Sequence, residues 1–155
     1  NNANNFSTVA ANGANVTLND NNGIDLGASN ITGTLDVTAE GNITDSGNLS
    51  VTGETTLNAN GNDITLNNAN NFTTVVANGA NATLNDNNGI DLGASNITGT
   101  LDVTATGEIT DSGNLSVTGE TTLNANGNDI TLNNANNFTT VVANGANVTL
   151  NDTNG

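Results

Sequence analysis

The sequence contains no lysine, arginine, histidine, cysteine, methionine, tryptophan, tyrosine or proline, and its formal net charge is −15. Proteins neutralise the phosphates of nucleic acids with Lys and Arg, and anionic membrane surfaces attract the same two residues. No apolar run approaches the ~18 residues that span a bilayer. The composition therefore argues against a nucleic-acid partner and against membrane insertion.

Missing side chains also exclude several kinds of site. Zinc, copper, haem and iron–sulfur centres rely on His or Cys, so none is expected, and no disulfide can form. Residue 1 does not begin a signal peptide. Without Lys or Arg the chain offers no cleavage site to trypsin-like proteases, and without Cys or Met it escapes thiol and thioether oxidation. These properties suit an extracellular or cell-surface location.

What is present is a long internal repeat. The segment NNANNF begins at Asn1, Asn67 and Asn133, which gives a period of 66 residues. Residues 1–66 and 67–132 form two copies, and residues 133–155 form part of a third. The two copies differ at five positions: Ser7/Thr73, Ala10/Val76, Val16/Ala82, Glu40/Thr106 and Asn42/Glu108. Low hydrophobicity with charge of one sign is typical of disorder, but repeats in register favour one continuous folded domain over 1–155, cut from something longer.

A finer pattern divides each copy into four units of 14 to 19 residues. Each unit opens with an apolar–polar–apolar triplet, which places two apolar side chains on one face of a short strand. In the second copy these triplets begin at Ile64, Ala82, Leu101 and Leu115. Asn-Gly pairs are typical of turns between strands, and they stand at 12–13, 60–61, 78–79 and 126–127.

Strands this short cannot enclose a core alone, but stacked units would bury a continuous column of aliphatic side chains. The pattern therefore predicts an all-β fold, a parallel β-helix or β-solenoid, with right-handed winding as β crossovers favour. We expect about four coils per 66 residues, or three if the two short units form one coil. A meander of β-hairpins is the competing fold, because Asn-Gly is also a favoured hairpin turn.

Two segments carry a resemblance to a known group of proteins: GANVTLNDNNGIDLGASNITGTLDVTA (13–39) and GNITDSGNLSVTGETTLNANGNDITLNNANNF (41–72). They resemble the repeats of filamentous haemagglutinin-like exoproteins, the large adhesins exported by two-partner secretion, and among them matrix-scaffolding adhesins. The resemblance implies a right-handed parallel β-helix, export, and adhesion or scaffolding of a biofilm matrix. It implies no catalytic residue. The secretion domain of that group has no match in this sequence.

Calcium is the one cofactor that the residues suggest. The segment LNDNNGID, at 18–25 and again at 84–91, gathers oxygen ligands around a glycine, as loops for hard cations do. Its candidate ligands are Asp20, Asp25, Asp86 and Asp91. No glutamate completes an EF-hand, and we favour the interpretation that the segment forms an Asx turn between strands, with cations only screening the acidic surface.

Enzyme activity is not expected. Cleavage of polysaccharides needs two carboxylates at a set distance in a cleft, usually with aromatic or basic residues that hold sugar. The only aromatic residues are Phe6, Phe72 and Phe138, in identical register, which indicates core positions. Sequons for N-glycosylation are abundant, for example at Asn15, Asn30 and Asn48, but a sequence rich in Asn and Thr produces such triplets by composition.

These observations predict a structural repeat segment of an extracellular adhesin or matrix fibre, a stiff rod for surface display, adhesion or scaffolding. A subunit of a self-assembling filament, in which chains stack end to end, is an alternative because uncovered strand edges invite another chain. A calcium-dependent binding module is a third possibility. The expected partners are neighbouring repeats or chains, a surface polysaccharide, or a cell-surface receptor.

Overall fold

The computed structural model describes residues 4–154, and every regular element in that part of the chain is a β-strand. The strands are β1 (Thr8–Val9), β2 (Asn12–Gly13), β3 (Val16–Asp20), β4 (Ile24–Leu26), β5 (Ser29–Ile31), β6 (Leu35–Ala39), β7 (Ile43–Asp45), β8 (Leu49–Asn58), β9 (Ile64–Gly79), β10 (Ala82–Asp86), β11 (Ile90–Leu92), β12 (Ser95–Ile97), β13 (Leu101–Ala105), β14 (Ile109–Asp111), β15 (Leu115–Asn124), β16 (Ile130–Asn144) and β17 (Val148–Asp152).

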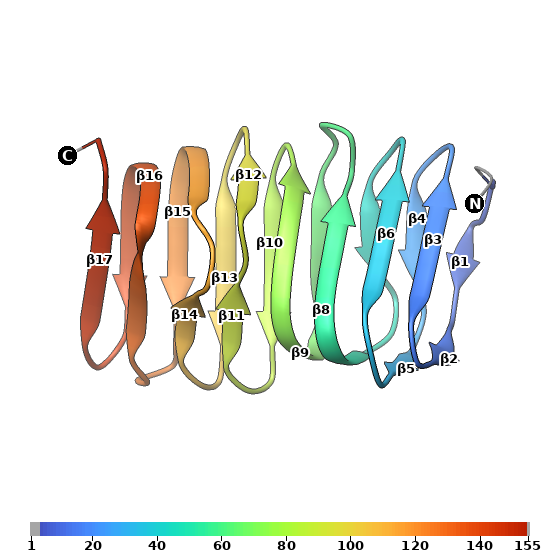
Figure 1. Cartoon of the computed structure of the whole chain (residues 1–155), viewed down its shortest axis with the longest axis horizontal. Coiled ribbons are helices and arrows are strands. Elements are labelled where there is room, and N and C mark those ends of the chain that lie inside the picture. The colour runs from blue at the N-terminus through green and yellow to red at the C-terminus, as the bar shows by residue number, and fades with distance from the viewer. Residues whose placement is uncertain (1–3, 155) are drawn as a thin grey trace.

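The strands wind into a parallel β-solenoid. Each strand pairs in parallel with the strand one turn away along the rod, as β3 does with β6 and β4 does with β7. In Figure 1 the strands nearest the viewer run upward, those behind run downward, and the chain advances from right to left, so the winding is right-handed. The predicted fold is confirmed. The hairpin meander is wrong, since a hairpin would join antiparallel neighbours.

Two repeats make seven turns. Starting from β3, successive parallel pairings lead through β6, β8, β9, β11, β14 and β16 to β17, which is seven steps. Strand β17 has the same sequence as β3, two repeats later. One 66-residue repeat therefore takes three and a half turns, between the two coil counts that the sequence suggested.

The half turn has a structural consequence. Strand β10 occupies in the second copy the place of β3 in the first, but β10 stacks in a different row, with β9 and β13. Equivalent residues of neighbouring copies consequently lie on opposite sides of the rod. The same residue returns to the same side only after two copies.

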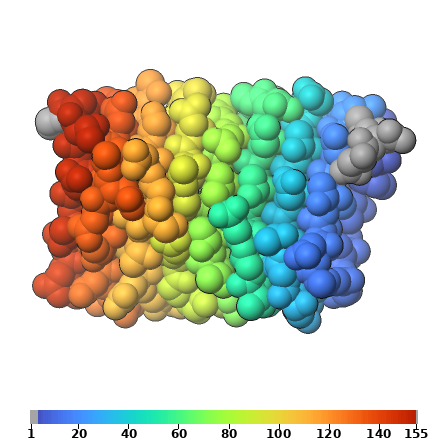
Figure 2. Space-filling model, viewed as in Figure 1, coloured from blue at the N-terminus to red at the C-terminus, as the bar shows by residue number. Residues whose placement is uncertain are grey.

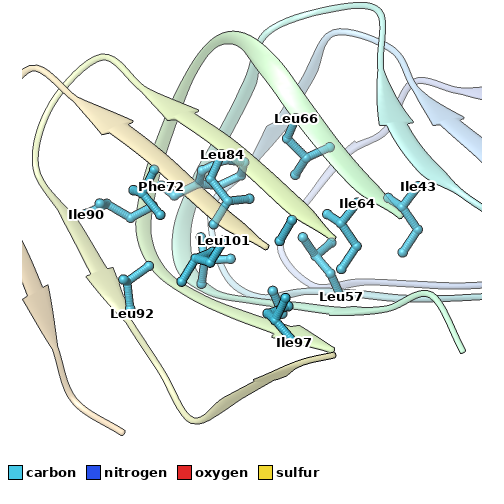
Figure 3. Close-up of a cluster of buried hydrophobic side chains, with 14 of the residues drawn as sticks. Ile43, Leu57, Ile64, Leu66, Phe72, Leu84, Ile90, Leu92, Ile97 and Leu101 are labelled. Carbon is cyan, nitrogen blue, oxygen red and sulfur yellow. The ribbon is translucent and has the colours of Figure 1, made fainter. Parts of the chain in front are cut away.

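The core is one aliphatic column that runs along the rod. Ile24, Ile43, Ile64, Ala82 and Leu101 lie over one another on five successive turns, and all are buried. Figure 3 shows how Ile43, Ile64 and other side chains point into the space enclosed by the ribbon. Stacking therefore gives each short strand the buried neighbours that it cannot find within its own turn.

The last predicted unit boundary is wrong. We expected Leu115 to follow Leu101 in the same row, but Leu101 pairs with Thr121, and Leu115 pairs with Ser95. The reason is that β15 is continuous through a corner near Gly119, so that its two halves belong to two faces of the rod. The short sequence unit that begins at Leu115 therefore does not form a complete turn of the solenoid.

Only some of the Asn-Gly pairs form turns. Asn60 and Gly61 have φ values of 48° and 83°, and the copy at 126–127 is alike. Asn12–Gly13 instead forms β2, and Gly79 ends β9, so the turn prediction is wrong at both of those pairs. At Gly79 a Cβ atom would lie 2.6 Å from the carbonyl oxygen of Asn62. Glycine is required there because two turns approach closely, and not because of its φ.

Candidate functional site

The rod formed by residues 4–154 has no hollow in which a small molecule could be enclosed. No pocket is found over residues 4–154, and the face shown in Figure 2 is continuous from turn to turn. The groups available for function are therefore the outward side chains of the rows and the few polar groups that the rod buries. Both sets include the aspartates that the sequence suggested.

Asp20 and Asp86 lie inside the rod, fully buried at the ends of β3 and β10. One carboxylate oxygen of Asp86 accepts a 2.7 Å hydrogen bond from the backbone N–H of Phe72 on the preceding turn, and the other accepts one of 2.8 Å from Asn88. Asp20 makes the same two bonds to Phe6 and Asn22. Through these hydrogen bonds each carboxylate holds in place the backbone of the loop that follows its strand and that of the preceding turn.

The environment of Asp86 is unfavourable to its charge. Burial raises the pKa of this carboxyl above its usual 3.8, and the two backbone hydrogen bonds oppose that rise. The sequence supplies no cationic side chain that could offset the cost of burying the charge. The bonds to backbone N–H groups are therefore the main compensation for keeping a carboxylate inside the rod.

Asp25 and Asp91 lie on the outside, on β4 and β11. Asp91 accepts hydrogen bonds from the hydroxyls of Thr74, at 3.2 Å, and Thr110, at 3.3 Å, and a further one from Ser112. Asp25 accepts the equivalent bonds from Thr44 and Ser46. These bonds join side chains on neighbouring turns, so the two outer aspartates link turns along the surface.

The loop LNDNNGID therefore does not bring its two aspartates together. In each copy one aspartate points into the core and the other lies on the surface, and no group of three or more acidic side chains suited to a metal ion occurs within residues 4–154. The bonds from Asn22 to Asp20 and from Asn88 to Asp86 span two residues, which is the geometry of an Asx turn. The geometry thus agrees with the Asx-turn interpretation.

A second buried polar network was not anticipated from the sequence. The side chain of Asn70 is buried, accepts a 2.8 Å hydrogen bond from the backbone N–H of Leu49 and donates one of 2.8 Å to Asp45. Asp111 and Asn136 repeat the arrangement in the next copy. The signal was present, because Asn70 falls at the same parity as the buried Leu66 and Phe72, and alternation therefore places it inward.

The outer surface carries a ladder of hydroxyl and carboxylate groups. On seven successive turns the stacked outward residues of one row are Thr8, Asp25, Thr44, Thr65, Thr83, Asp102 and Thr122. Neighbouring strands of a sheet lie ~4.8 Å apart. The ladder is therefore a regular array of short polar side chains with that spacing. It offers hydrogen-bonding groups and negative charge, and no aromatic surface.

Comparison with known proteins gives one match. Residues 13–78 and 79–144 each match the family described as repeats of unknown function (DUF5649). The matched unit is 66 residues long, like the repeat seen in the sequence, but it begins at residue 13 and not at residue 1. No curated protein and no solved structure matches the chain. Residues 4–154 form no helix, and so they contain no helical membrane span.

Proposed function

The chain belongs to this family of repeats of unknown function, and from its geometry we propose that it is a stiff structural segment of an exported surface adhesin or matrix fibre. It acts by its length and stiffness, as a rod that displays or scaffolds, and it has no enzymatic role. The observation that carries the proposal is the continuous stack of seven turns with a single core.

The geometry supports a mechanical role because repeats can be added without changing the cross-section of the rod. Strand β17 lies in the row of β3 and has its sequence, so a further pair of copies continues the same core and the same backbone pairing. Every turn is pinned to its neighbours by parallel backbone hydrogen bonds. Length can therefore vary by copy number while stiffness is kept.

An extracellular location is supported by composition and by resemblance. The absence of Lys, Arg, Cys and Met suits exposure to proteases and oxidants, and the repeats resemble those of filamentous haemagglutinin-like exoproteins. Export of the whole protein through a dedicated outer-membrane partner is the corresponding proposal. The outer ladder of hydroxyls and carboxylates suits a hydroxyl-rich partner such as a surface polysaccharide.

The rod proposal is tested by varying repeat number. Chains of two, four and six repeats are measured by small-angle scattering, and we expect the length to rise linearly by about 17 Å per repeat, three and a half turns at ~4.8 Å each. A length that rises as the square root of copy number would show flexible linkage and contradict the proposal. Display of the same series on a bacterial surface tests adhesion: adherence and reach should increase with copy number, and no dependence would contradict the adhesive role.

One observation favours end-to-end assembly as a second candidate function. Val148 and Leu150 on β17 are 43% and 39% exposed, whereas their counterparts Ala82 and Leu84 are buried. Within a longer chain the following turn would cover these side chains, and between chains a second copy would do so. Sedimentation over a range of concentrations tests this candidate. A polymer that is lost when Val148 and Leu150 are both replaced by glutamate supports assembly through this edge, and a chain that is monomeric at all concentrations contradicts it.

A further inference from the structure

The sequons of the chain are arranged by the fold in a way that the sequence does not reveal. In Asn96-Ile97-Thr98 the central isoleucine is buried, and Asn96 and Thr98 are both exposed. The first-copy sequon at Asn30 and the sequon Asn71-Phe72-Thr73 have the same pattern. In each, an asparagine and a hydroxyl two residues later stand on the same outer face, where both parts of the acceptor motif are accessible from solvent.

The sequons differ in whether the asparagine amide is free. The side chains of Asn30, Asn71 and Asn96 make no hydrogen bond within the described part of the chain. By contrast, the Nδ2 group of Asn81 donates a 2.9 Å hydrogen bond to Asp63, and its Oδ1 atom accepts bonds from the backbone N–H and the hydroxyl of Thr100. The sequon at Asn81 is therefore held by its neighbours, although Asn81, like Asn96, is an exposed residue.

The free sequons lie along two sides of the rod. Asn30, Ser50 and Asn71 stack on three successive turns, so three sequons contribute to one row. Asn96 lies in another row, between Asn78 and Ser116. Because one repeat takes three and a half turns, Asn30 and its copy Asn96 face opposite sides.

We propose that the folded rod is an acceptor for N-linked sugar at Asn30, Asn71 and Asn96, and that the bonded amide of Asn81 is not modified. In this reaction the Nδ2 atom forms a bond to the anomeric carbon of an activated sugar, and the bond from that carbon to the donor phosphate breaks. The phosphate-bearing group leaves with the bonding electrons, and the amide proton passes to a base of the transferase. The sugar donor is a nucleotide sugar.

The modification has a physical consequence for the rod. Neutral, bulky sugars would line two opposite sides at positions that recur with the repeat, and would cover part of a surface that is otherwise acidic. It does not depend on the adhesive role, because it concerns only the acceptor geometry of the folded chain.

The test uses the full chain and a sequon-specific N-glycosyltransferase with UDP-glucose. Modified positions are mapped by mass spectrometry after cleavage at acidic residues, because the chain has no tryptic site. Synthetic peptides around Asn81 and Asn96 are treated in parallel and report the acceptor quality of each sequon without the fold. We expect the two peptides to react comparably and the folded chain to react at least about tenfold more at Asn96 than at Asn81, the lower end of the factor that corresponds to losing one hydrogen bond to a charged group.

Two variants sharpen the test. Thr98→Val removes the sequon hydroxyl with little change of shape and should abolish transfer to Asn96. Asp63→Ala releases the amide of Asn81 and should raise transfer there, with circular dichroism confirming that the fold is kept. The proposal is overturned if the folded chain stays unmodified at Asn96 while its peptide reacts, if Asn81 and Asn96 react equally in the folded chain, or if neither peptide nor chain accepts sugar.

Discussion

The buried carboxylate of Asp86 accepts a 2.7 Å hydrogen bond from the backbone N–H of Phe72, 14 residues earlier in the chain. The bond recurs between Asp20 and Phe6 at 2.8 Å and between Asp152 and Phe138 at 3.1 Å. In each copy it fixes the segment that carries the phenylalanine against the following turn. An acidic residue in a loop that resembled a cation site therefore serves as a brace inside the rod.

Removing this brace should destabilise the chain. Asp86→Ala leaves the buried N–H group of Phe72 without an acceptor, whereas the N–H group of the exposed Asn88 can bind water. We expect a loss of about 1–3 kcal/mol from the one unmet buried donor. The measurement is urea unfolding followed by circular dichroism. The matched control is Asp102→Ala, an exposed aspartate of the same copy, which should change stability little; equal losses for both variants would contradict the bracing role.

The dependence of stability on pH should reveal the same carboxyl. Because burial raises the pKa of Asp86 above 3.8, the folded chain keeps this proton to a higher pH than the unfolded chain does. The contribution of the group is fully present below about 3.8 and is lost as pH rises through the folded pKa. Unfolding free energies of the natural chain and of Asp86→Asn are compared from acid to neutral pH. The natural chain should lose stability relative to the variant as pH rises; a constant difference would refute the assignment.

Replacing a threonine whose buried hydroxyl has no hydrogen-bond partner by valine should increase the stability of the chain. The hydroxyl oxygens of Thr55 and Thr121 are buried and make no hydrogen bond. Thr121→Val keeps the shape and removes the unmet polar group, so we expect a gain of about 1 kcal/mol. The neighbouring Thr122→Val, on the outer face, is the control and should have a smaller effect. A destabilised Thr121→Val chain would show that the hydroxyl has a partner after all, such as a bound water.

Close approach of successive turns predicts which glycines are essential. A Cβ atom on Gly119 would lie 2.6 Å from the carbonyl oxygen of Gly99, whereas one on Gly13 would meet only the Val16 side chain, at 3.8 Å. We expect Gly119→Ala to cost about 1–3 kcal/mol by overpacking against backbone and Gly13→Ala to be tolerated. Thermal unfolding of the two variants checks this, and similar melting temperatures would contradict the corner geometry.

Salt should stabilise a rod with charge of one sign. The chain carries a net charge of −15 and no cationic side chain, so raising the ionic strength from about 0.01 M to about 0.15 M, which shortens the screening length from about 30 Å to about 8 Å, should raise the melting temperature. Magnesium and calcium at equal ionic strength should act alike if screening is diffuse. A markedly larger effect of calcium would support a calcium-dependent binding module instead.

Much of the fold followed from alternation in the sequence. Leu66, Val103 and Val117 were expected to face inward from their apolar–polar–apolar triplets, and all three are buried. The phenylalanines were expected in the core, and Phe72 and Phe138 lie there. These predictions succeed because the side chains of a strand alternate between two faces whatever the strand packs against.

The places where prediction failed depend on where the chain bends. Nothing in the residues 115–124 distinguishes a strand that crosses a corner from one that begins a new turn, so Leu115 was assigned to the wrong row. The roles of Asp20 and Asp25 were not separated, although alternation carried the signal: Asp20 has the same parity as Val16 and Leu18, and Asp25 stands between the buried Ile24 and Leu26. The row of Leu115, by contrast, depends on the path of the backbone at a corner, which a local pattern does not fix.

The sequence by itself determined that short parallel strands stack around an aliphatic core with a 66-residue period, because alternation and repetition are local properties of the chain. Only the tertiary structure decided that each period takes three and a half turns, which places equivalent residues of neighbouring copies on opposite sides of the rod. The reason is that the number of residues in a turn is set by how corners, bulges and close backbone contacts fit one turn upon the next.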